Sequence, residues 1–182
     1  MPEGVSAPPA SASDEELVRA VEQVWRRLFR EAGLKYEPVK VRHFGDPGAK
    51  PCAPEEEGFA GLYCQDERAI YFSRERSGQW RYVVAHEVGH HVQELRGTFT
   101  AAEEEAGGGP LRFTDVHLRE ELQADCYSGV WAHAVGLPPP GEWYHDVAEG
   151  EPGTHAQRRR WLHRGLRTGR PADCDPFAVA SP

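Results

Sequence analysis

The sequence predicts a single α+β domain in which helices predominate and a small sheet lies beside them. One segment repeats its apolar residues at three- and four-residue steps, as the buried face of a helix does, and three others have the apolar positions, caps or stops of helices. Two shorter segments have the composition of strands. The chain has 182 residues, of which 39% are hydrophobic and five are Trp, so it can build one core, and no linker divides it.

The first half of the chain is predicted to hold one long helix and both strands. Residues 1–12 are mostly Pro, Ala, Ser and Gly, so they cannot offset the entropy lost on ordering and are expected to be disordered. The folded domain is therefore expected at 13–182. Ser13 and Glu16 have capping-box spacing and begin an amphipathic helix that Gly33 ends. The strands are expected at 39–44 and 69–72, with a Pro- and Gly-rich loop at 45–58.

The second half is predicted to hold three helices. The first spans about 79–96 and is followed by Gly, and the second spans about 115–135, before Gly and three Pro stop it. A charged, Gly-rich connection at 101–110 is expected to be a solvated loop between them. The last helix opens with a second capping box and runs over about 155–166.

Composition and motif searches exclude several classes of function. Asp and Glu outnumber Lys and Arg by 29 to 21, and the net charge of -8 opposes attraction to a phosphate backbone, so no nucleic-acid partner is expected. No stretch approaches the roughly 20 apolar residues of a membrane helix, so no membrane segment is expected in this chain. The sequence has neither a Walker-type phosphate loop nor a Gly-x-Ser-x-Gly elbow.

Candidate metal ligands lie in the helix predicted at 79–96, in the pattern His86-Glu87-x-x-His90. Side chains four residues apart project from one face of a helix, so both imidazoles can bind one ion. Two imidazoles and a carboxylate suit Zn²⁺, and a catalytic zinc site leaves one position to water. Glu87 flanks this face and is the candidate general base. His91 is rotated by about 100° from His90 and is expected to be an ordinary packed or surface residue.

The following helix supplies two carboxylates with the same four-residue spacing. Glu121 is the candidate third ligand, and Asp125 is expected to accept a hydrogen bond from the distal nitrogen of a ligand His. Glu120 lies about 100° around the helix and is expected to be solvated, unless the ligand position is shifted by one residue. His117 is interpreted as a bystander, with an extra ligand or an oxyanion-stabilising group as the alternatives.

Four cysteines, Cys52, Cys64, Cys126 and Cys174, allow two disulfides in three pairings. Reduced thiols are an equal alternative, because a chain of this size does not need disulfides to fold. The residues alone therefore leave the redox state open.

Several segments, in this order, resemble the neutral zinc metallopeptidases of bacteria, a family with His-Glu-x-x-His and a distant Glu in the gluzincin arrangement. These segments are Val24-Trp25, Tyr63-Cys64, 85–93, 121–126, 129–132, 156–158 with Arg160-Trp161, and 172–175. The resemblance covers most of the chain after residue 20. It implies a zincin-like core, one Zn²⁺ held by His86, His90 and Glu121, and Glu87 as catalytic base. It also implies the pairings Cys52–Cys64 and Cys126–Cys174, and hence an extracytoplasmic location, with the cytoplasm as the alternative.

One segment departs from the family pattern. Family members often carry His-Gly-Thr-Ser before Ala-Gln-Arg, whereas this chain has Pro152-Gly-Thr-His155. The role of the missing His is then vacant or taken by His155, a candidate catalytic residue that would stabilise the oxyanion. Helix capping and surface exposure are the alternative interpretation of His155. Family members also commonly carry a membrane segment before this domain.

Together these patterns predict a zinc metallopeptidase that hydrolyses peptide bonds in a peptide or protein substrate. Metal-activated water would attack the carbonyl, with Glu87 moving the proton. The alternative is a non-catalytic zinc-stabilised binding or regulatory module. A fourth protein ligand such as His117 would favour this alternative, because structural zinc sites are usually closed by four ligands.

Overall fold

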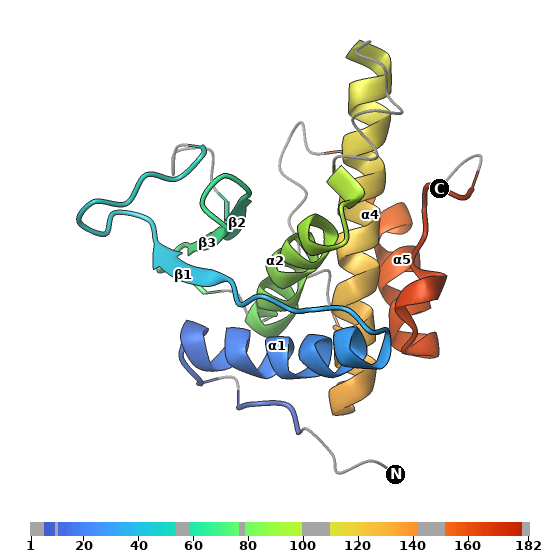
Figure 1. The fold of residues 1–182 in the computed structure, drawn as a ribbon, viewed down its shortest axis with the longest axis horizontal. Coiled ribbons are helices and arrows are strands. Elements are labelled where there is room, and N and C mark those ends of the chain that lie inside the picture. The colour runs from blue at the N-terminus through green and yellow to red at the C-terminus, as the bar shows by residue number, and fades with distance from the viewer. Residues whose placement is uncertain are drawn as a thin grey trace.

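The protein is described by a computed structural model that covers residues 6–9, 11–53, 59–76, 79–99, 110–141 and 152–179, with side chains from 114 onward in the fifth range. Helices predominate within these residues, and the helix-rich α+β class is confirmed (Figure 1). The helices are α1 (Asp14–Glu31), α2 (Trp80–Leu95), α4 (Pro110–Val135), α5 (His155–Thr168) and the short 3-10 helix η2 (Pro171–Asp173). The strands are β1 (Lys40–His43), β2 (Gly61–Cys64) and β3 (Ala69–Phe72).

The elements follow one another across the molecule as sheet, α2, α4 and α5, and α1 crosses beside α2 and α4 (Figure 1). The main core lies between these layers and contains Trp25, Trp80, Trp131 and Trp161, each at most 4% exposed. The arrangement places α4 in contact with α2 on one side and α5 on the other.

Helix α1 begins with the predicted capping box, in which Ser13 and Glu16 bond to each other's backbone N–H. Its first residue, Asp14, is buried and ties three elements together. Asp14 accepts hydrogen bonds from Trp80 Nε1 at 2.7 Å and Arg76 at 2.7 Å, and it lies 2.9 Å from His43 Nε2. This carboxylate therefore links the start of α1 to β1 and to the start of α2.

The sheet has the strand order β1-β3-β2, with β1 parallel and β2 antiparallel to β3. Every residue of β3 is buried, as expected for the apolar run Ala-Ile-Tyr-Phe at the centre of a sheet. Strand β2 pairs Gly61 with Phe72 and Cys64 with Ala69. It was not predicted as a strand, and it forms the sheet edge that packs beside α2.

Two glycines allow the helices to approach closely at the centre of the molecule. A Cβ atom on Gly89 of α2 would lie 3.1 Å from the carbonyl oxygen of Ala124 in α4. A Cβ atom on Gly165 of α5 would lie 1.9 Å from the carbonyl oxygen of Cys126 in α4. The three helices therefore meet almost backbone to backbone, which brings their polar side chains within reach of one another.

Some boundaries differ from the sequence prediction. Helix α4 begins at Pro110, five residues before the predicted start near 115, because Pro is well tolerated in the first turn of a helix. Helix α5 continues to Thr168 and ends at Gly169, which has the left-handed φ of 62°. The solvated loop expected at 101–110 lies outside the described residues, apart from Pro110. Of the segment expected to be disordered, residues 6–9, 11 and 12 are described, and Ala12 is buried.

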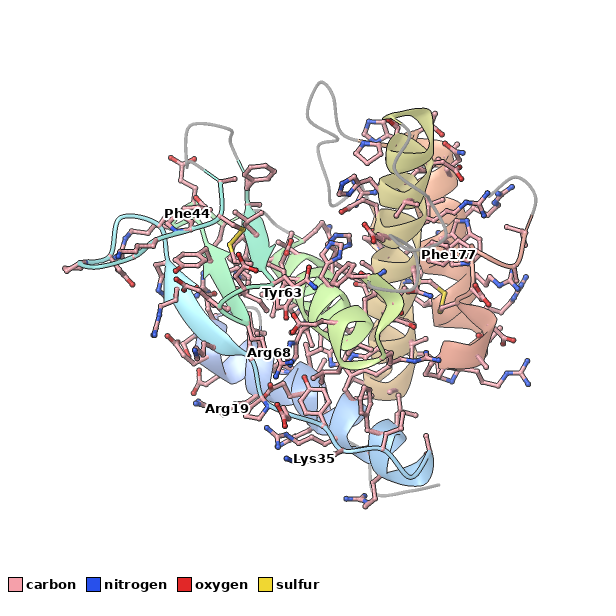
Figure 2. The ribbon with its side chains drawn as sticks, turned by 45° about the horizontal axis from the view of Figure 1, so that its top comes forward. Arg19, Lys35, Phe44, Tyr63, Arg68 and Phe177 are labelled. Carbon is pink, nitrogen blue, oxygen red and sulfur yellow. A yellow bond between two sulfur atoms is a disulfide. The ribbon has the colours of Figure 1, made fainter. Side chains whose placement is uncertain are left out.

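Two disulfides fasten the edges of the fold, in the pairing that the family resemblance implied (Figure 2). Cys52–Cys64 joins the loop after β1 to strand β2, and Cys126–Cys174 joins α4 to the segment after η2. In both bridges the Cα atoms are 5.6 Å apart. Among the described residues, no helix is both long and apolar enough to cross a membrane.

Candidate metal centre

Three predicted ligands meet at the interface of α2 and α4. His86 Nε2 lies 3.0 Å from His90 Nε2 and 3.2 Å from Glu121 Oε2, and His90 Nε2 lies 3.2 Å from Glu121 Oε1. A tetrahedral zinc about 2.0–2.1 Å from each ligand atom would hold those atoms about 3.3 Å apart. The donor set and its spacing therefore fit a zinc ion, and within the described residues this is the one cluster of its kind.

Helix geometry and close packing bring these ligands together. His86 and His90 are one turn apart on α2, and Glu121 lies on α4, one turn before Asp125. Gly89 lies between His86 and His90 in the sequence, and Ala124 lies between Glu121 and Asp125. The backbones of Gly89 and Ala124 approach closely where α2 packs on α4. The contact between two small residues therefore sets the distance across which the larger side chains converge.

Each imidazole also has a partner for its second nitrogen. His86 Nδ1 lies 3.0 Å from Asp125 Oδ1, in the position predicted for a residue that orients a ligand His. His90 Nδ1 lies 2.8 Å from Gln93 Oε1, a contact that was not predicted. The Gln93 amide group donates in turn to the carbonyl of Glu120 at 2.8 Å. Asp125 and Gln93 each accept a hydrogen bond from the Nδ1–H of one imidazole. Both Nε2 atoms are then directed at the candidate ion site.

Arg158 of α5 completes the centre from the other side of α4. It is fully buried, donates from Nε to Asp125 Oδ2 at 2.8 Å, and donates from a terminal nitrogen to Glu121 Oε2 at 2.9 Å. One guanidinium therefore supports both carboxylates. The connection of Arg158 to this site was not predicted from the sequence.

The imidazoles of His86 and His90 and the carboxylate of Glu121 stabilise one another's charged forms. Burial opposes the charged form of His86, but its contacts with Asp125 and Glu121 outweigh burial and raise the pKa of His86 to about 10. Burial likewise opposes charge on His90, whereas Glu121 raises the His90 pKa. The two imidazoles outweigh burial at Glu121 and hold its pKa well below the usual range. A metal ion would have to displace protons here, because ligand imidazoles bind metal in their neutral form.

Glu87 lies between α2 and the edge strand β2. It is 5% exposed, and burial raises the pKa of its carboxyl group above the usual value, although His86 and His90 lower it. The nearby backbone N–H of Tyr63 also lowers this pKa slightly. Strand β2 has glycine beside Glu87, since a Cβ atom on Gly61 would lie 2.7 Å from Glu87 Cγ. Strand β2 therefore lies beside Glu87 and leaves space for it.

The side chain of Tyr63 attaches the same strand to α2 one turn further along. Its hydroxyl group lies 3.0 Å from His91 Nδ1 and donates to Glu94 Oε2. His91 is fully buried, and its Nε2 lies 2.7 Å from the carbonyl oxygen of Glu37. The expectation that His91 is a packed residue is confirmed. We call the contacts of Tyr63 with His91 and Glu94 the Tyr63 clamp.

Three other candidate residues lie outside the ligand cluster. His117 is 48% exposed and pairs with Glu120 at 3.3 Å. Glu120 is 6% exposed, so the expectation of a solvated charge was wrong, because α4 is covered at this turn by α2. His155 is the exposed first residue of α5, next to the helix cap Thr154. A catalytic role for His155 stays a prediction.

Comparison with known proteins places this fold and cluster in one class. Residues 7–138 match a protein family described as "Putative neutral zinc metallopeptidase". The match covers more than half of the chain, which therefore belongs to the neutral zinc metallopeptidase family.

The relatives of the chain are longer proteins. The chain is similar to the uncharacterized protein Rv2575 of Mycobacterium tuberculosis (strain H37Rv), at 28% identity over 88% of this chain and 68% of the relative. It is also similar to the uncharacterized protein YpfJ of Escherichia coli (strain K12), at 25% identity over 88% of this chain and 69% of the relative. No solved structure matches the chain.

Proposed function

We propose that this protein is a zinc-dependent metallopeptidase that hydrolyses peptide bonds in a peptide or protein substrate. The observation that carries the proposal is the convergence of His86, His90 and Glu121, with atoms 3.0–3.2 Å apart, next to the buried carboxylate of Glu87. Family membership supports the same chemistry. His86, His90 and Glu121 are proposed to hold one Zn²⁺.

The proposed roles follow from position and charge. A bound zinc would supply Lewis acidity, which polarises a peptide carbonyl and lowers the pKa of water. Glu87 would accept a proton from the attacking water and deliver it to the departing nitrogen. The raised pKa of Glu87 suits both steps, because a base that must also return a proton works best when its pKa lies near the ambient pH. Asp125 and Arg158 would fix His86 and Glu121 in place.

The exposure of the ligands favours catalysis over a purely structural zinc site. The side chains of Glu121 and His90 are 24% and 13% exposed, whereas that of His86 is 3% exposed. Two of the three candidate ligands are therefore partly accessible to solvent, which suits a catalytic site with a free coordination position. His117 pairs with Glu120 at the edge of this region, which gives no support to a closed four-ligand site.

We propose an extracytoplasmic location for the domain. Two disulfides in a chain that could fold without them are typical of oxidising compartments. The alternative is a cytoplasmic location. In that case the four cysteines would be reduced, and a thiol-specific label would react with them in cells.

The function is tested by the substitution Glu87→Gln. This change keeps the size of the side chain and removes the proton acceptor, so we expect about one zinc per chain by elemental analysis and a loss of peptidase activity of at least about 100-fold. A double variant, His86→Ala with Glu121→Ala, should bind no zinc. Undiminished turnover by Glu87→Gln would refute the proposed base, and a parent protein that retains no zinc after reconstitution would refute the metal centre.

A further inference from the structure

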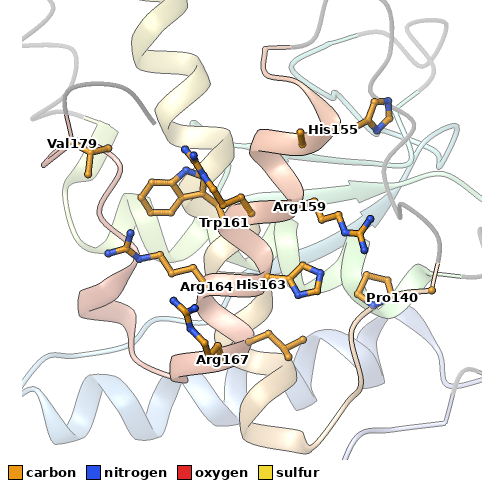
Figure 3. A pocket seen from close by; sticks show the side chains of 12 residues that line it. Pro140, His155, Arg159, Trp161, His163, Arg164, Arg167 and Val179 are labelled. Carbon is orange, nitrogen blue, oxygen red and sulfur yellow. The ribbon is translucent and has the colours of Figure 1, made fainter.

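The outer face of α5 carries four arginines, Arg159, Arg160, Arg164 and Arg167, which we call the α5 arginine face. All four residues are exposed. Together with two histidines of the same helix they line a hollow of about 1140 Å³, and Figure 3 shows several of their side chains projecting from α5. The buried side of the helix consists of Arg158, Trp161, Leu162 and Gly165.

Within the part of the chain that the structure describes, no carboxylate lies within ion-pair distance of this face. Helix α5 contains no Asp or Glu that could pair with its arginines. Among the carboxylates that the structure describes, none forms an ion pair with the four arginines, and Arg164 instead lies 5.0 Å over the ring of Trp161. Arg158, on the opposite side of the helix, is paired with Asp125 and Glu121. A patch of four positive charges therefore stands on a protein whose net charge is -8.

We propose that the α5 arginine face binds an acidic peptide segment of a partner protein. Guanidinium groups bind carboxylates with two parallel hydrogen bonds, so each arginine is suited to one Asp or Glu side chain. Arg159 and Arg167 are eight residues apart, or about 12 Å along the helix at 1.5 Å per residue. An extended peptide covers that distance with about four residues. The matching ligand is a run of about four to six acidic residues.

A short peptide fits better than an extended polyanion. A membrane surface or a nucleic acid reaches beyond the patch and meets the field of the whole protein, whose net charge of -8 repels it. Membrane binding by a basic patch also gains from an apolar anchor, and Leu34 at the end of α1 is the one exposed large apolar residue among those described. A peptide of about 12 Å contacts the patch alone, because charges further away are screened within about 8 Å at physiological salt.

The proposal is independent of peptidase activity. The arginine face and the metal centre use opposite sides of α5, so an acidic peptide could bind whether or not zinc is present. Binding can therefore be measured without turnover. A failure of this proposal would leave the proposed enzyme intact, and an inactive enzyme would leave this proposal intact.

The test is fluorescence anisotropy with a fluorescein-labelled hexaglutamate peptide and the full chain, with hexaglutamine as the uncharged probe. We expect saturable binding of hexaglutamate that weakens about tenfold or more when salt rises from about 50 mM to about 500 mM. The double variant Arg160→Glu with Arg164→Glu should bind at least about tenfold more weakly. The matched control, Arg19→Glu with Arg30→Glu, makes the same charge change on the exposed side of α1 and should bind as the parent does.

Two results would overturn the proposal. The parent protein could fail to bind hexaglutamate at low salt, or the α1 control could lose as much affinity as the α5 variant. Binding to vesicles containing phosphatidylglycerol, in the absence of peptide binding, would instead make the patch a membrane-binding surface. If charge reversal prevents folding, as circular dichroism would show, Arg164→Gln with Arg167→Gln provides the same test with neutral side chains.

Discussion

At the scale of single residues, the metal centre depends on one side chain that ligand spacing does not predict. Arg158 donates to Asp125 and Glu121 from a fully buried position, while the adjacent Arg159 is exposed. The two arginines therefore have the same chemistry in opposite environments. This pair allows the value of the buried contact to be measured against a matched control.

Replacing Arg158 with Met should destabilise the protein strongly. The change keeps an unbranched side chain of similar length but leaves two carboxylates without their shared donor, and breaking a buried ion pair costs about 3–5 kcal/mol. We expect the free energy of unfolding in urea to fall by about that amount, measured with a chelator present so that zinc does not contribute. Arg159→Met should stay within about 0.5 kcal/mol of the parent. Similar losses for both variants would show that the Arg158 contacts contribute little.

The candidate ligands could be predicted because their spacing is a property of one helix at a time. His86 with His90, and Glu121 with Asp125, each follow the four-residue repeat of a helix face. The burial of Arg158 requires knowing which side of α5 faces inward. A signal was present in the sequence, since Trp161, Leu162 and Gly165 follow Arg158 at three-, four- and seven-residue steps.

At the scale of elements, helices were easier to predict than the sheet. The capping boxes at Ser13 and Thr154 fixed two helix starts, because both partners lie within four residues of sequence. Strand β2 has four residues, one of them Gly61, and too little alternation to indicate a strand. Its pairing with β3 and its contact with α2 are tertiary, so sequence patterns do not show them. This unpredicted strand is the element that lies beside Glu87.

Removing the Tyr63 clamp should show how strongly the position of β2 affects activity. Tyr63→Phe removes the hydroxyl group that contacts His91 and Glu94 but leaves the backbone of β2, which lies beside Glu87, unchanged. We expect an unfolding free energy lower by about 1–3 kcal/mol, unchanged zinc content and a severalfold lower kcat, since buried polar groups lose their partner and β2 loosens.

The matched control for the clamp is Tyr71→Phe. Tyr71 lies in the neighbouring strand β3, and its hydroxyl group contacts Glu67 at 2.8 Å and Lys50 at 3.3 Å, away from α2. This variant should keep the parental kcat. If the two variants changed kcat equally, the clamp would have no specific role in positioning Glu87.

At the scale of the whole molecule, the C-terminal segment is joined to the metal centre by a chain of polar contacts. His90 contacts Gln93, which donates to Gln123 at 3.1 Å, and Gln123 donates to the carbonyl of Cys174 at 2.8 Å. Cys174 is also bonded to Cys126 of α4. The disulfide therefore holds the far end of the network that orients a proposed zinc ligand.

Removing this disulfide should weaken both folding and zinc binding. Cys126→Ala with Cys174→Ala removes a bridge between residues 48 apart, which should lower the free energy of unfolding by about 4 kcal/mol through chain entropy. It also loosens residue 174, whose backbone carbonyl accepts the hydrogen bond from Gln123. Loss of such orienting contacts lowers zinc affinity by about 10- to 100-fold, measurable by competition with a chelating dye.

The control for this prediction is Cys52→Ala with Cys64→Ala, which removes the bridge at the sheet. These residues are 12 apart, so the free energy of unfolding should fall by about 3 kcal/mol. This control should also unfold more easily but keep the parental zinc affinity, because none of its contacts with described residues reaches the ligands. Equal zinc affinity in both variants would mean that the metal centre is positioned by α2 and α4 alone.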